Sequence, residues 1–107
     1  MKKFAMIQMG EDYNPEVHKN CFSLQNRESY NLTVRNMEEA CELAKKLVEE
    51  GFGAIELCGA FGEENARKLV EVTENKIPIG YVVNFPEQVQ MAIDFFAEVK
   101  NEKKEKL

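Results

Sequence analysis

The sequence predicts a single α/β domain of about four mostly parallel strands, with three main helices as crossovers and covers. Short apolar runs alternate with helical periodicities, and strand, helix, strand, helix, strand and helix follow one another from residue 31 onward. Such alternation favours parallel strands joined by right-handed crossovers. A chain of 107 residues has room for one hydrophobic core. We therefore expect one domain over residues 1–100 and a charged C-terminal tail over residues 101–107.

Four short segments have the composition of strands, being apolar runs or alternating stretches rich in β-prone residues. They cover residues 4–9, 31–35, 54–58 and 79–83. The polar stretch from Gly10 to Tyr30 separates the first two and could hold one helical turn after Pro15.

Three helices are predicted from apolar periodicity and end signals. The first follows Asn36 as N-cap and ends before Gly51, a residue that can adopt a positive φ. The second covers about residues 63–74, and the third opens at residues 84–87. The third has an unusually wide apolar face made by Val89, Met91, Ala92, Ile93, Phe95, Phe96, Ala97 and Val99. Deep packing or a homo-oligomer interface would each explain that width.

The composition restricts the partners. A net charge of −5 without a basic cluster argues against nucleic acid. No apolar window approaches the roughly 18 residues of a membrane span. Three cysteines without paired spacing favour reduced thiols and a cytoplasmic location.

Glu56 is the least expected residue in the predicted sheet. It lies among Ala54, Ile55, Leu57 and Cys58, in a strand that we expect to be covered on both faces. A buried carboxylate requires an ion-pair partner, a hydrogen bond or a proton, and burial would raise its pKa. A structural ion pair, a strand edge open to water and a functional carboxylate all remain open.

The segment Gly59-Ala60-Phe61-Gly62 joins that strand to the second helix. Backbone N–H groups at such a turn can bind an anion, although Glu63 and Glu64 in the first helical turn oppose one. In open α/β sheets ligands bind at the carboxyl ends of strands, an edge that would also carry Asn84. Cys58 is either a reactive thiol at this edge or a small buried filler.

His18 is the only histidine and precedes Cys21 by three positions. It could act in acid–base chemistry or contact a ligand over the sheet edge. No further ligand spacing accompanies this pair, so we predict no metal site. The sequence leaves any cofactor unknown.

Three segments together resemble a family of short prokaryotic proteins classed as a domain of unknown function. They are residues 3–7, residues 14–18 and residues 55–62, the last being the most distinctive. The resemblance spans most of the chain and implies a small α/β protein with no assigned activity.

Two hypotheses follow for the function. The first is a self-associating module that binds a small ligand, with an anion as one candidate, through Gly59–Gly62 and Asn84. The alternative is a small enzyme that uses Glu56 and His18 for proton transfer, with Cys58 as nucleophile.

Overall fold

The computed structural model describes the backbone of residues 1–106 and the side chains of residues 1–97. In chain order its elements are β1 (Lys2–Met9), β2 (Asn20–Ser23), β3 (Arg27–Val34), α1 (Met37–Glu49), β4 (Ala54–Leu57), α2 (Gly62–Val72), β5 (Ile79–Tyr81), the short 3-10 helix η1 (Pro86–Gln88) and α3 (Val89–Lys106). The predicted boundary at residue 100 stays a prediction, and Val99 and the charged tail lie outside the described side chains.

The five strands form one sheet in the order β2-β3-β1-β4-β5. β1 pairs in parallel with both β3 and β4, and β4 pairs in parallel with β5, whereas β2 is antiparallel to β3. The predicted α/β class is therefore confirmed, with one strand more than expected. That strand, β2, forms within the polar stretch after Gly10. The expected helical turn after Pro15 is reduced to a turn in which the Val17 and His18 N–H groups donate to the Asn14 carbonyl (3.0 and 2.8 Å).

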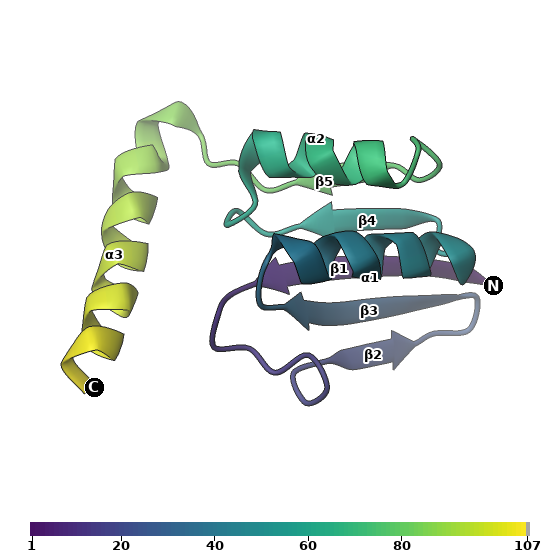
Figure 1. Ribbon diagram of the computed structural model, residues 1–107, viewed down its shortest axis with the longest axis horizontal. Helices are drawn as coiled ribbons and strands as arrows, with labels where there is room; N and C mark the ends of the chain where they lie inside the picture. The colour runs from purple at the N-terminus through teal and green to yellow at the C-terminus, as the bar shows by residue number, and fades with distance from the viewer. Residues whose placement is uncertain (107) are drawn as a thin grey trace.

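Both crossover helices cover the same face of the sheet (Figure 1). The connection from β3 through α1 to β4 and the connection from β4 through α2 to β5 run across the sheet in one direction. Right-handed crossovers that run in one direction place their helices on one side. The connection from β1 to β3 runs the opposite way and would cover the other side, but it consists of a loop and β2 instead of a helix.

The hydrophobic core lies between the sheet and these two helices. Alternate residues of the strands face it, and Ile7, Ile55, Leu57 and Leu69 are its largest fully buried side chains. Small residues at the helix positions, Ala40, Ala44 and Ala66, let the helices approach the sheet closely. Phe61, at the start of α2, is also part of this core.

Within the described residues, no helix lies over the opposite face of the sheet. By strand alternation Phe4, Met6 and Glu56 lie on this face, the first two half-buried and Glu56 exposed. The prediction that the 54–58 strand is covered on both faces is therefore wrong. The physical reason is the common direction of the two crossovers, which leaves the second face without a layer.

The predicted ends of the first helix are confirmed. The Asn36 side chain accepts a hydrogen bond from the Glu39 N–H (2.9 Å), and Gly51 has a φ of 84° just beyond the last turn. The second helix begins at Gly62, whose φ is 72°, and its N-cap residue Phe61 makes no side-chain capping bond.

Helix α3 stands beside the sheet at its carboxyl edge (Figure 1). Among its described side chains only Ala92 is half-buried, and the others are exposed. The radius of gyration is 14.9 Å, compared with about 13 Å for a compact domain of this length. The expectation of a deeply packed terminal helix is therefore not met within one chain. None of the described helices combines the length and apolarity that a transmembrane span requires.

Candidate functional site

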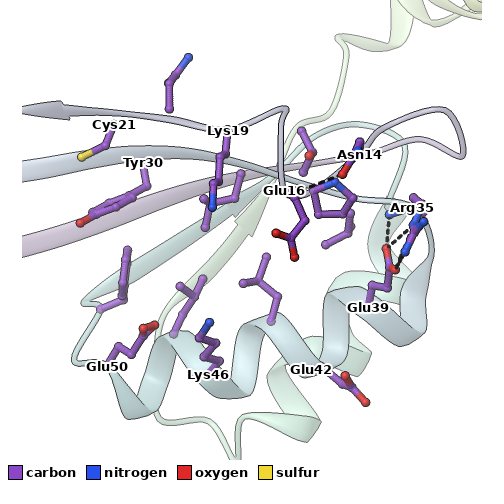
Figure 2. Close-up of a pocket in the computed structure, with 18 of the residues that line it drawn as sticks. Asn14, Glu16, Lys19, Cys21, Tyr30, Arg35, Glu39, Glu42, Lys46 and Glu50 are labelled. Atoms are coloured by element: carbon purple, nitrogen blue, oxygen red, sulfur yellow. Dashed lines mark hydrogen bonds and ion pairs between the residues drawn. The ribbon is translucent and has the colours of Figure 1, made fainter.

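A wide groove runs between α1 and the β2–β3 part of the sheet, on the face that carries the helices (Figure 2). It forms because α1 and α2 cover the middle and the β5 side of this face, while no helix follows them over β2. Its volume is about 1050 Å³. Apolar side chains make up its floor, namely Tyr30, Leu32, Val34, Leu43, Leu47 and Phe52.

Charged side chains line the two walls of this groove (Figure 2). Glu16 and Lys19 come from the loop before β2, Lys46 comes from α1, and Glu50 is the C-cap residue of that helix. Figure 2 shows Lys19 and Lys46 extending from opposite walls toward the space between them. An apolar floor between walls of both charges suits a small organic molecule with a charged end.

Lys3 and Arg35 already have partners within the protein. Lys3 Nζ donates to the Glu50 carbonyl (3.4 Å) and lies 5.4 Å from the centre of the Phe52 ring. Arg35 forms an ion pair with Glu39 (2.6 Å). By contrast, the ammonium groups of Lys19 and Lys46 have no hydrogen-bond or ion-pair partner among the described residues. These two ammonium groups are therefore available to a ligand.

The ion pair at the end of the groove also stabilises the start of α1. A Glu39 carboxylate oxygen accepts from the Arg35 backbone N–H (2.8 Å), and the carboxylate accepts from the Arg35 guanidinium. The guanidinium hydrogen bonds and the backbone hydrogen bond lower the pKa of Glu39, and the same pair raises the pKa of Arg35. The Glu39 carboxylate is thus already paired with Arg35.

Tyr30 is the titratable residue of the floor. Its hydroxyl donates to the Glu28 carboxylate (3.2 Å), and Cys21 lies opposite it on β2. Burial, followed by the interaction with Glu28, raises the pKa of Tyr30 to about 12. At neutral pH its hydroxyl is therefore a hydrogen-bond donor and carries no charge.

His18 lies outside the groove, at a second hollow of about 330 Å³ near the carboxyl ends of β1 and β3. Its Nδ1 accepts a hydrogen bond from the Asn14 N–H (2.8 Å), and its carbonyl accepts from the Thr33 hydroxyl (2.8 Å). In a neutral ring this arrangement leaves the proton on Nε2. The ring also makes an edge contact with Tyr13, 5.9 Å between centroids.

The structure does not join the three predicted catalytic residues by hydrogen bonds. Glu56 is exposed on β4 between Met6 and Gly80 of the neighbouring strands. Because the second sheet face is uncovered, Glu56 does not need the partner that we expected. No described residue forms a hydrogen bond or ion pair with the Glu56 carboxylate. Their use in catalysis stays a prediction.

Cys58 lies at the carboxyl end of β4 and packs against the core. Its sulfur accepts a hydrogen bond from the Met9 N–H (3.4 Å), which orients the thiol toward the end of β1. This placement agrees with the alternative of a small, partly buried filler.

The predicted anion-binding segment is a tight turn between β4 and α2. The Phe61 N–H donates to the Cys58 carbonyl (3.1 Å), Gly59 and Ala60 are exposed, and Phe61 is only 3% exposed. Asn84 lies on the exposed segment that leaves β5. Neither of the two hollows is lined by these residues, and anion binding here stays a prediction.

Sequence reasoning did not find the groove residues Lys19 and Lys46. Lys46 can be placed next to the apolar stripe of α1 by helical periodicity. Lys19 belongs to a stretch without periodicity, and only the pairing of β2 with β3 brings it over α1. Among the described residues no group of three or more His, Cys, Asp or Glu is arranged to hold a metal ion.

The fold and the groove define a small α/β protein with a sheet covered on one face and an open groove beside α1. The chain matches a family of unknown function, DUF6506, over residues 2–97, and it belongs to that family. The resemblance to a family without an assigned function is thereby confirmed. Comparison with curated proteins and with solved structures produced no match.

Proposed function

We propose that this chain is a self-associating cytoplasmic domain that binds a small organic ligand in the groove between α1 and β2–β3. The ligand has an apolar body, which lies on the floor, and an anionic group, which lies between Lys19 and Lys46. The observation that carries this proposal is the pair of unpartnered ammonium groups on opposite walls of an apolar groove. A hydrogen bond to a charged group typically makes a net contribution of about 1.5–3 kcal/mol, which here would favour the bound state.

Three other features support this proposal. The Tyr30 hydroxyl stays protonated, because its pKa is about 12, and adds a polar group to the floor. The groove volume of about 1050 Å³ is at the upper end of small-molecule sites, which run to about 1000 Å³. The three cysteines are free thiols in the structure, which supports a reducing compartment.

Ligand binding can be tested by thermal-shift screening of the full chain. The probes are aliphatic and aromatic carboxylates and phosphate monoesters, with acetate and inorganic phosphate as ions that lack an apolar body. A ligand at 100 times its Kd stabilises the native state by about 2.7 kcal/mol, which raises the melting temperature. We expect at least one probe with an apolar body to do so, and acetate and inorganic phosphate not to.

A matched pair of variants then locates the ligand. Lys46→Gln removes an ammonium group from the groove, and we expect it to weaken binding about 10- to 100-fold. Lys45→Gln makes the same change one residue away, at an exposed position that does not line the groove, and should leave binding unchanged. Equal loss in both variants, or no shift with any probe, would contradict the proposal.

Self-association is supported by the exposed apolar side chains near the C-terminus. Val82, Val83, Phe85, Val89, Met91, Ile93, Phe95 and Phe96 are each at least 41% exposed. Apolar side chains exposed in such number within one short segment are typical of contact surfaces in folded proteins.

A further inference from the structure

The first half of helix α3, residues 89–97, is apolar around most of its circumference, and one chain leaves it without a covering layer. Within its described part, only Gln90 and Asp94 are polar, and they are hydrogen-bonded to each other on one side of the helix (2.9 Å). A helix that is apolar on nearly all sides is a buried helix. The side chains of Phe95 and Phe96 are nevertheless 56% and 66% exposed.

The same chain has a sheet face that no helix covers. Phe4, Met6 and Ala54 lie half-buried on it, and Phe22 on the edge strand β2 is 62% exposed. In α/β proteins with parallel strands both faces of the sheet are usually covered. One chain thus has both an apolar helix that nothing covers and a sheet face that no helix covers.

The helix and the sheet face match in size and in charge. The apolar part of α3, residues 89–97, is roughly 14 Å long, and five strands at about 4.8 Å spacing span roughly 19 Å, so this part would reach across most of the sheet. Residues 82–97 carry Glu87 and Asp94 and no basic residue. The uncovered face carries Lys2 and Arg27, which face each other in register, and one acidic residue, Glu56.

The exposed surface is also large enough for a stable dimer. A buried phenylalanine removes about 150–250 Å² from water, and each chain exposes more than half of Phe85, Phe95 and Phe96. With the aliphatic residues beside them and the sheet face opposite, two such contacts exceed the roughly 1,200 Å² of a specific interface.

We propose that α3 of each chain packs across the uncovered sheet face of a second copy, so that two chains exchange their C-terminal helices. The proposal rests on the self-association named in the proposed function and is independent of the ligand. The contact is reciprocal, because each copy supplies one helix and one sheet face, as in a symmetric dimer with exchanged elements. It supplies the layer that the connection from β1 to β3 does not provide.

A substitution at Gly80 can test this contact without disturbing the fold of the single chain. Gly80 lies on the uncovered face next to Glu56 of β4, and a Cβ added there would meet no atom within 4 Å. Gly80→Arg therefore fits one chain, and its guanidinium can pair with Glu56 across the strands. The same side chain would occupy the space that the partner's helix needs.

Gly53→Arg is the matched control. Gly53 is exposed at the amino end of β4, and an added Cβ would be 3.7 Å from the Lys3 carbonyl oxygen, an ordinary contact. Light scattering after size-exclusion chromatography should show two chains per particle for the unaltered protein and for Gly53→Arg. Gly80→Arg should run as a single chain with an unchanged far-ultraviolet circular dichroism spectrum.

A mixing experiment tests the exchange itself. Phe95→Ser with Phe96→Ser alters the helix and should also produce single chains. Mixed with Gly80→Arg, this variant should form a heterodimer, because one intact helix then meets one intact sheet face. If Gly80→Arg is still a dimer, the helix exchange is overturned, whereas self-association is not. A single-chain unaltered protein overturns both, whereas neither result alters the ligand titration in the groove.

Discussion

Glu56 shows how the meaning of a residue depends on what covers it. In one chain this carboxylate is exposed on the open sheet face and has no partner among the described residues. The reasoning that burial would force a partner on it is sound, but its premise fails, because no helix lies over that face. If a second copy covers the face, Glu56 becomes part of the interface.

Tyr30 provides a prediction at the scale of one residue. Its pKa in the folded chain is raised to about 12, whereas an unfolded tyrosine ionises near 10. The folded state holds the proton more tightly, so its contribution to stability is complete below pH 10 and is lost as the pH rises toward 12. We expect Tyr30→Phe to lose less stability than the unaltered protein over this interval.

Urea unfolding at a series of pH values measures this difference, with Tyr13→Phe as the control at another tyrosine. Identical pH profiles for Tyr30→Phe and the unaltered protein would show that Tyr30 titrates alike in both states.

Among the elements, α1 and α3 differ in what stabilises them. Helix α1 has a side-chain cap at its start, a glycine of positive φ after its end and a buried apolar face. Helix α3 has an apolar surface without a covering layer in the single chain. Isolated helices are marginal in water, so most of the stability of α3 must come from packing.

Asn36 is the residue through which the start of α1 can be tested. Its side-chain oxygen accepts from the Glu39 N–H, one of the first backbone donors that the helix itself leaves unpaired. We expect Asn36→Ala to lower the free energy of unfolding by about 1 kcal/mol, and Asn36→Asp to preserve it.

Chemical denaturation at neutral pH measures both variants. Asn65→Ala is a suitable control, because Asn65 lies inside α2 and is not a cap. An equal change in the free energy of unfolding at both positions would mean that the capping hydrogen bond of Asn36 does not stabilise α1.

At the scale of the whole molecule, the uncovered sheet face and the extended C-terminal helix have one common consequence. If two chains complete each other, the native state is a dimer, and mass action makes its melting temperature depend on protein concentration. We expect the melting temperature of the unaltered protein to rise with concentration.

The single-chain variant Gly80→Arg should melt at a temperature independent of concentration. Calorimetry or circular dichroism over a hundredfold range of concentration measures both. A concentration-independent transition in the unaltered protein would contradict a native dimer.

Much of the architecture could be predicted because its causes are local. The ends of α1 follow from Asn36 and Gly51, and the parallel strands follow from the alternation of strands and helices. Strand β2 escaped prediction, since an exposed edge strand of four residues has no buried face and therefore no alternation. The groove was not predicted either, because Lys19 lies opposite α1 only as a result of the pairing of β2 with β3.

By itself, the sequence determined the class of fold, the positions of the main elements and the family, since propensity, capping and periodicity act over a few residues. Only the tertiary structure decided that α1 and α2 share one face, that Glu56 is open to water and that Lys19 faces Lys46. The first two features depend on the direction in which each crossover runs across the sheet, and the third depends on the pairing of β2 with β3. Each is a relation between separate segments, which local propensity and periodicity do not determine.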